Sequence, residues 1–444
     1  MLPTAPRRVP LLGHIPALLS DPMGLLMDAR LSGDVVQLYI GTRRYYLLNS
    51  PEFIHQLLVT EAGNVARGRI FEKARVFTGQ GLATSDGTTH RKQRRIMQPA
   101  FHARRMTGYA EIIQAEAASV ASSWTSGQKL ALDEELGNLT LAIITRSIFS
   151  DDYCEGIVTE VRSLLPNLVK YGFVRTLVPD SWERFPGFGG RQLVAMRSRL
   201  ENLVREAMSH YRSTGSNRTD LLSMLLDARY EDTGLPMSDD QLCDEVISLL
   251  FTGSETVATT LSWLFHELGR NPAVESRLHA ELDMALQDGP LTYTDLSKLR
   301  YLNLVLNEAL RLHSPAWFLM RQLTAPIDFG EFRIPAGAEV VYSSTALHRD
   351  PAIYPDPMRF DPDRWTAEKA HPQRLTFIPF GMGRHQCLGY QFARTEASIV
   401  VAAVASRWHL LPDPRHTVRA RALTTLRPNA LRVTARRRSH SPED

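Results

Sequence analysis

A long stretch of helical periodicity between two strand-rich regions constrains the fold most strongly. Over about residues 88–313, apolar side chains recur at spacings of three and four, the period of amphipathic helices. Short runs rich in Val, Ile and Tyr lie at roughly 33–60 and 320–345, and a last helix follows a cysteine loop within 377–406. Because both strand-rich regions flank one helical region, we predict one interleaved domain over residues 1–444, mainly α with small β-sheets (α+β).

Composition and charge exclude several classes of protein. Hydrophobic residues make up 43% and charged residues 22% of the 444, as in average globular chains. A net charge of +3 is too small to indicate a nucleic-acid partner, and three cysteines are too few for a disulfide framework. The apolar run at 9–20 is broken by Pro10, Gly13 and Pro16, so it predicts neither a membrane span nor a signal peptide. We therefore expect a cytoplasmic protein with no membrane or nucleic-acid partner.

The segment FGMGRHQCLG at 380–389 is the densest local signal. Three glycines surround Cys387, and they let the backbone approach a flat ligand closely. The helical pattern that follows places Cys387 at a helix N-terminus, where the dipole and N–H groups favour a thiolate. Such a thiolate suits a redox-tuned iron–sulfur bond. A buried, inert cysteine beside a Gly-rich turn is the alternative interpretation.

The spacing F-x-x-G-x-H-x-C-x-G over 380–389 resembles the heme-binding signature of the cytochrome P450 superfamily. The segments HRKQRRIMQPAF, TGSET and RIPAG are similar to soluble actinobacterial members that act after sesquiterpene cyclases. The resemblance implies a single-domain cytochrome P450 fold and heme b (iron protoporphyrin IX) as cofactor. It implies Cys387 as the metal ligand, with Phe380 and Gly381 against the heme.

One long helix is predicted from Ser238 to the sequence before Pro272. Ser238 and Gln241 have the spacing of a capping box, and Pro272 should end the helix. Its middle, FTGSET at 251–256, holds poor helix formers whose hydroxyls can bond back to the preceding turn and bend the helix. A tolerated glycine beside a solvated glutamate is the simpler explanation of this segment.

The same segment resembles the oxygen-binding groove of the P450 superfamily. The resemblance implies that Thr256 hydrogen-bonds dioxygen or its water and that Glu255 helps to relay protons. Thr252 stands where a small apolar residue is usual, and it would narrow the pocket beside the iron.

Glu308 and Arg311 are three residues apart and share one face of a predicted helix. Such a pair is commonly a weak surface salt bridge. It resembles the superfamily's Glu-x-x-Arg helix, whose distant third arginine would be Arg364. The resemblance implies a charge network that braces the cysteine loop, with Asp363 and Trp365 as departures from the usual pattern.

Two heme propionates would need basic partners. His90 and Arg94, four apart in HRKQRR, resemble the superfamily's propionate pair, and Arg321 and His385 would complete the set. The simpler interpretation of HRKQRR is a solvated basic face. Its neighbouring arginines could also form a docking face for an acidic electron donor.

The resemblance maps a substrate pocket onto separate, mostly apolar segments, which suits a hydrocarbon-like substrate. Each of these residues would by itself be interpreted as core. The predicted lining residues are Phe71, Phe77, Leu249, Leu250, Thr252, Trp317, Phe318, Leu319, Thr424 and Thr425.

The predicted activity is monooxygenation of a hydrophobic small molecule with O2 and two electrons, with a sesquiterpene or related terpenoid as the favoured substrate. The chain lacks a G-x-G-x-x-G strand–helix unit, so we expect it to bind no flavin or NAD(P). Electrons would come from a ferredoxin and an NAD(P)H-dependent ferredoxin reductase, and we expect a monomer. The alternatives are a fatty acid or macrolide/polyketide substrate, a peroxide-driven heme-thiolate enzyme, and a non-enzymatic heme-binding sensor.

Overall fold

The computed structural model describes residues 2–149, 154–177, 190–214, 220–287, 291–366 and 375–439, which fall into two units. Unit 1 consists of Met1–Ile70, Asn303–Cys387 and Arg419–Asn429. Unit 2 consists of Phe71–Leu302, Leu388–Val418 and Ala430–Asp444. Residues 45–48 pair with residues 339–342 within unit 1, so the two strand-rich regions share one sheet.

Unit 1 is built on a five-stranded sheet whose order is β1-β2-β8-β5-β3. β2 and β8 run parallel, and the other neighbours are antiparallel. The predicted hairpin is confirmed as β1 and β2, with Gly41 at φ +62° in the turn. The strands are β1 (Val35–Ile40), β2 (Arg43–Leu48), β3 (Val65–Arg67), β5 (Leu319–Leu323) and β8 (Glu339–Tyr342).

Both faces of this sheet are buried. Val36 and Leu47 belong to one hydrophobic cluster, and their neighbours Val35 and Leu48 belong to another. The alternation follows from the two-residue period of a strand, which sends successive side chains to opposite faces. The strand-rich segments at 33–60 and 320–345 therefore supply both core layers of unit 1.

Short helices and two hairpins complete unit 1. The helices are α1 (Ile15–Ser20), α2 (Pro22–Arg30), α3 (Pro51–His55), α14 (Ser344–His348) and most of α13 (Arg300–Leu312). The hairpins are β6 (Ile327–Phe329) with β7 (Phe332–Ile334) and β10 (Ala420–Ala422) with β11 (Leu426–Pro428).

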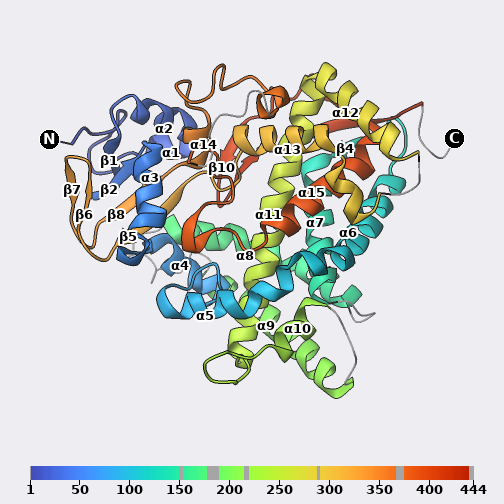
Figure 1. The fold of residues 1–444 in the computed structure, drawn as a ribbon, viewed down its shortest axis with the longest axis horizontal. Helices are drawn as coiled ribbons and strands as arrows, with labels where there is room; N and C mark the ends of the chain where they lie inside the picture. The colour runs from blue at the N-terminus through green and yellow to red at the C-terminus, as the bar shows by residue number, and fades with distance from the viewer. Residues whose placement is uncertain are drawn as a thin grey trace. The chain divides into compact units, whose positions relative to one another are not determined.

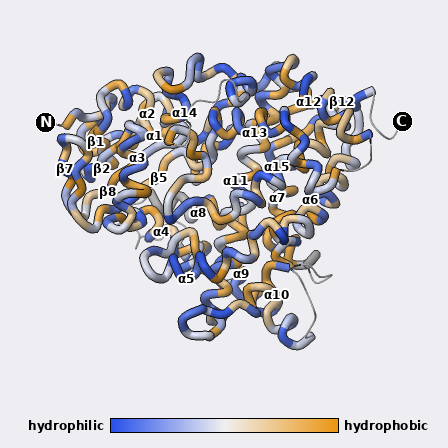
Figure 2. Tube along the Cα trace, in the orientation of Figure 1, coloured by the Kyte–Doolittle hydropathy of each residue, from blue (hydrophilic) through white to orange (hydrophobic). Residues whose placement is uncertain are grey.

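Unit 2 is mainly helical, and α11 packs against α7, α9 and α15 (Figure 1). Figure 2 shows α5 as a largely hydrophilic helix, in keeping with its HRKQRR segment. Within the described part of the chain, each helix is too short or too polar to cross a lipid bilayer. The helices are α5 (Gly87–Met97), α6 (Ala103–Ser123), α7 (Leu132–Ile148), α8 (Cys154–Leu177), α9 (Gly190–Thr214), α10 (Leu221–Asp227), α11 (Asp239–Arg270), α12 (Pro272–Ala285) and α15 (Tyr390–Ala405); α4 (Arg69–Thr78) begins in unit 1.

The long predicted helix is confirmed as α11, which begins after Ser238 and ends at Arg270. The Ser238 hydroxyl accepts a hydrogen bond from the Gln241 backbone N–H at 3.2 Å. The reciprocal half of the predicted capping box is wrong, because the Gln241 side chain donates to Glu245 Oε1 at 2.6 Å instead. The Gln241 side chain is thus directed towards buried Glu245, one turn further along the helix.

The strands near the C-terminus belong to different sheets. β11 pairs with β10, whereas β12 (Arg432–Arg437) pairs with β4 (Lys129–Ala131) and β9 (Trp408–Pro412). Arg438 directly follows β12, is buried and donates to Asp283 at 2.6 Å.

Candidate functional site

The cysteine loop of unit 1 is a hydrogen-bonded turn that exposes the Cys387 side chain. The Cys387 backbone N–H donates to Phe380 O at 2.9 Å, and the Gly381 N–H donates to Ile378 O at 3.0 Å. Gly381 and Gly383 both have φ +68°, a region that suits glycine. Cys387 lies just before Gly389, the N-cap of α15, so the predicted helix start is placed two residues early. Its N–H is used in the turn.

The space around Gly383 is closed, whereas the space around Gly381 is open. A Cβ on Gly383 would lie 2.0 Å from Leu58 O, so the neighbouring backbone requires glycine there. A Cβ on Gly381 would meet nothing nearer than His385 O at 4.0 Å, which leaves an open side beside Cys387. Heme iron in heme-thiolate proteins is held by one cysteine thiolate, and the exposed Cys387 thiol fits that role, with open space at Gly381 for a flat ligand.

Glu308 is the centre of a buried charge network in unit 1. Its carboxylate accepts from Arg311 Nε and Nη2 at 2.8 and 2.9 Å and from Arg364 Nε at 2.9 Å. Glu308 and Arg311 are 0% exposed. The expected trio therefore meets. Trp365 is a further partner that was not predicted, and its indole N–H donates to Glu308 Oε2 at 2.9 Å.

A chain of hydrogen bonds connects this network to the cysteine loop. Arg311 Nη1 donates to His348 O at 2.7 Å, and the Ile378 N–H donates to His348 Nε2 at 3.0 Å. Ile378 O in turn accepts from Gly381. Burial lowers the pKa of His348 to about 3, helped by the charge of Arg311, so Nε2 is a neutral acceptor. This link through His348 between Arg311 and Ile378 was not predicted, because the three residues lie far apart along the chain.

Arg321 and His385, two predicted propionate partners, also belong to unit 1. Arg321 is buried in β5 between its register partners Arg67 on β3 and Val340 on β8. Its Nη1 donates to Met320 O at 2.7 Å. His385 ends the short 3-10 turn Gly383–His385 and is half-buried.

The predicted pocket residues of unit 1 lie largely in its core. Trp317 belongs to a buried hydrophobic cluster, and its indole N–H donates to Leu423 O at 3.2 Å. The Phe318 ring lies 5.4 Å from the Trp317 ring, and half-buried Leu319 begins β5. Thr424 and Thr425 form the turn between β10 and β11.

In unit 2, His90 and Arg94 lie one turn apart on α5, as their spacing predicts. His90 is buried and Arg94 is half-buried. Glu255 and Thr256 are both half-buried in α11. The Thr256 hydroxyl donates to Thr252 O at 2.9 Å, which leaves its oxygen lone pairs able to accept a hydrogen bond.

The middle of α11 also packs against α7. A Cβ on Gly253 would lie 3.0 Å from Ile144 Cγ1, and Thr140 Oγ1 donates to Ser254 O at 3.1 Å. Gly253 therefore has a packing reason that is independent of any oxygen-binding role. Thr252, like Thr256, bonds back to the preceding turn, at 2.8 Å to Ser248 O.

One predicted pocket residue of unit 2, Phe77, forms an aromatic pair with Phe251, which was not among the predicted lining residues. The Phe77 and Phe251 rings meet edge to face, with centroids 5.5 Å apart and planes at 82°. Phe77 and Leu250 are buried, whereas Phe71 and Leu249 are half-buried.

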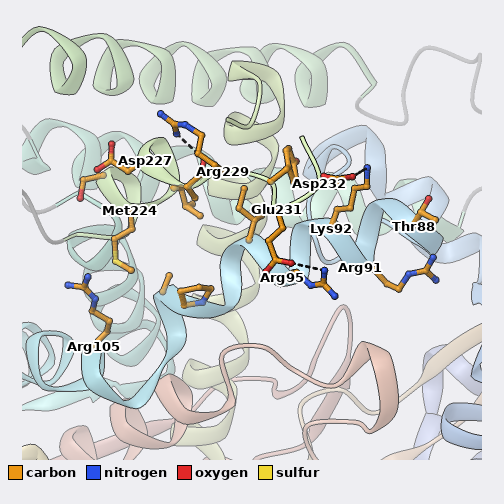
Figure 3. A pocket seen from close by; sticks show the side chains of 17 residues that line it. Thr88, Arg91, Lys92, Arg95, Arg105, Met224, Asp227, Arg229, Glu231 and Asp232 are labelled. Atoms are coloured by element: carbon orange, nitrogen blue, oxygen red, sulfur yellow. Dashed lines mark hydrogen bonds and ion pairs between the residues drawn. The ribbon is translucent and has the colours of Figure 1, made fainter. Parts of the chain in front are cut away.

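A cleft of about 620 Å³ in unit 2 lies between α5 and the segment 223–232, and it involves none of the predicted pocket residues (Figure 3). Lys92 pairs with Asp232 at 2.6 Å, and Arg95 pairs with Glu231 at 2.8 Å. These two acids neutralise part of the basic face that the sequence predicts on α5. Exposed Arg91 remains beside the cleft.

The sequence pattern described as Cytochrome P450 matches residues 3–432. The chain belongs to the cytochrome P450 family. Cyclooctat-9-en-7-ol 5-monooxygenase of Streptomyces melanosporofaciens is 38% identical over 94% of this P450 and 91% of the relative. Cyclooctatin synthase of the same species is 37% identical over 97% and 94% of the two chains. Pentalenene oxygenase of Streptomyces avermitilis is 33% identical over 98% and 97%.

A solved structure confirms the predicted fold. The crystal structure of the cytochrome P450DA heme domain matches this P450 with a TM-score of 0.89 and 27% identity, over 99% of this chain and 98% of the other. The P450 fold, mainly α with small sheets, is thus established, and the P450 is an oxidoreductase of the monooxygenase type. Family membership implies a heme-thiolate cofactor, O2, a hydrophobic substrate and a redox partner.

Proposed function

We propose that this P450 hydroxylates a carbocyclic terpenoid, using O2 and two electrons delivered by a ferredoxin and its NAD(P)H-dependent reductase. The observation that carries the proposal is the exposed Cys387 thiol beside the open side of Gly381, in a chain that its terpenoid-oxidising relatives match over nearly their whole length. The family match spans segments of both units, which supports one P450 domain.

Heme b held by Cys387 supplies the activation of dioxygen and the transfer of one oxygen atom to a C–H bond. The substrate gains a hydroxyl group, and the second oxygen atom leaves as water after two electrons and two protons are taken up. Phe380 and Gly381 lie against the cofactor in this proposal. Four basic side chains neutralise its carboxylates: His90, Arg94, Arg321 and His385.

Thr256 and Glu255 manage protons in the proposed reaction. The Thr256 hydroxyl donates its hydrogen bond to Thr252 O, so its oxygen is free to accept a hydrogen bond from a water at the site. Glu255 is one residue earlier and half-buried, and it transfers protons to that water. Thr252 narrows the space beside them. The charge network of Glu308, Arg311 and Arg364 supports the cysteine loop through His348 and takes no part in the chemistry.

The terpenoid assignment rests on what the relatives act on. One relative is a 5-monooxygenase of cyclooctat-9-en-7-ol and another is an oxygenase of pentalenene. The predicted pocket residues are mostly apolar, which favours such a hydrocarbon-like substrate over one that needs many polar anchors. Fatty acids and macrolides are the competing substrate classes, and neither has a representative among these three relatives.

Spectroscopy and turnover together test the proposal. The carbon-monoxide complex of the reduced wild-type enzyme should show the red-shifted band of a heme thiolate, and Cys387→Ser should abolish it. Cyclic terpenoid alcohols should shift the heme spin state, whereas fatty acids and macrolides should not. Reductant, ferredoxin and reductase should yield a hydroxylated product that peroxide alone does not. A persistent thiolate band in Cys387→Ser would refute the ligand, and product from peroxide alone would favour the peroxide-driven alternative.

A matched pair tests proton delivery. Thr256→Ala should divert reducing equivalents into peroxide while substrate binding is kept, because the accepting oxygen is lost. Thr252→Ala, one turn earlier, keeps that oxygen and should remain coupled. Equal coupling in wild type and Thr256→Ala would contradict the role of Thr256.

A further inference from the structure

Two histidines and a glutamate meet in unit 2, on elements that the proposed heme chemistry does not use. Glu275 and His279 are four residues apart on α12, so their side chains lie on one face, one turn from each other. His409 comes from β9, and its ring centroid lies 4.7 Å from that of His279. One candidate ligand atom from each side chain lies within 4.8 Å of the other two.

The separation of His279 from Glu275 suits a shared ion better than a direct hydrogen bond. His279 Nε2 lies 3.9 Å from Glu275 Oε1, which is too long for a hydrogen bond. His409 Nδ1 lies 3.5 Å from Glu275 Oε2, at the outer limit of a hydrogen bond. Two ligand atoms on one tetrahedral zinc ion, each about 2.1 Å from it, are roughly 3.4 Å apart, so both separations are near the spacing of atoms that share an ion.

The His279 nitrogen supplies an independent reason to expect a ligand. The His279 side chain is 7% exposed, and its Nε2 is buried with no hydrogen-bond partner among the described residues. An unsatisfied buried nitrogen costs free energy, and a bound cation would remove that cost.

The surrounding charges leave room for a cation. The Arg438 guanidinium acts electrostatically on both His279 and Glu275, but it donates to Asp283 at 2.6 Å and to two backbone carbonyls. Arg436, opposite His409 on β12, is exposed to water. Asp283 adds a negative charge near His279. The His409 side chain is 38% exposed and provides a path from solvent.

We propose that Glu275, His279 and His409 bind one divalent transition-metal ion of the Zn²⁺ class. Two imidazoles and a carboxylate are borderline ligands that suit zinc better than calcium or magnesium. Three protein ligands leave at least one position for water, on the side that His409 opens to solvent. The ion would join α12 to β9 and so stabilise unit 2 without entering the heme chemistry.

Zinc binding to the heme-loaded enzyme, first freed of zinc with a chelator, tests the proposal. Equilibrium dialysis with elemental analysis should find one Zn²⁺ for each wild-type chain, and added Zn²⁺ should raise the melting temperature. His409→Asn and Glu275→Gln should each weaken binding at least tenfold and abolish the thermal shift. Both residues are partly exposed, so these variants are expected to fold, and an unchanged carbon-monoxide spectrum verifies this.

His102→Asn is the matched control. His102 is an exposed histidine of unit 2 outside the cluster, and asparagine can replace it as the N-cap of α6. This variant should bind Zn²⁺ as wild type does. Stoichiometric zinc that survives in both His409→Asn and Glu275→Gln would overturn the proposal. Wild-type enzyme that binds no zinc would also overturn it and would leave the cluster as a simple ion pair.

Discussion

Glu308→Gln tests whether the buried charge network supports the cysteine loop. In the wild type, the Glu308 carboxylate accepts from both arginines, from Trp365 and from the Asp361 N–H at 2.9 Å. Glutamine keeps the shape and removes the negative charge. Arg311, which is 0% exposed, would then be a buried cation facing only neutral carbonyl acceptors at His348 and Arg359.

The expected cost is about 3–5 kcal/mol of unfolding free energy, the usual cost of removing one partner of a buried ion pair. Urea titration of the heme-loaded variant should show this loss as a lower midpoint, followed by both tryptophan fluorescence and the heme absorbance. Loss of the thiolate band should accompany it, because His348 and Ile378 connect Arg311 to the cysteine loop.

An exposed pair in the same unit is the control. Arg333 and Asp328 lie 3.1 Å apart with side chains 70% and 58% exposed, so Asp328→Asn should cost less than about 1 kcal/mol. A loss below about 1 kcal/mol in Glu308→Gln, equal to that of the surface variant, would refute the claim that the network carries the loop.

Three further predictions concern single positions. Burial raises the pKa of Glu245 to about 8, so the folded state holds a proton that the unfolded chain loses above about pH 4.5. The unfolding free energy of the wild type should therefore fall by about 1.4 kcal/mol per pH unit between about pH 4.5 and pH 8. Glu245→Gln should flatten that slope in urea titrations. Gly383→Ala should prevent heme incorporation, read from the heme absorbance, because its Cβ would lie 2.0 Å from Leu58 O. Lys92→Ala removes an exposed ion pair and should change the melting temperature by less than 2 °C while weakening salt-dependent binding of an acidic ferredoxin.

Features that depend on near neighbours could be predicted from the sequence. The hairpin of β1 and β2 needs only alternating side chains and a glycine in the turn, and α11 needs only its period, Ser238 and the proline after its end. The spacing of Glu308 and Arg311 places them on one face of any helix that contains them. The signature at 380–389 was enough to predict the family, because its glycines and Cys387 all lie within one short segment of the chain.

Other features depend on which distant segments meet. Trp365 and His348 become partners of the Glu308 network only when segments some forty to sixty residues away pack against α13. β12 pairs with β4 and β9 rather than with β11, and it carries Arg438 to Asp283. His409 likewise reaches Glu275 and His279 from far along the chain. Tertiary structure decides such contacts, because local propensity and spacing hold no information about which remote surfaces bury each other.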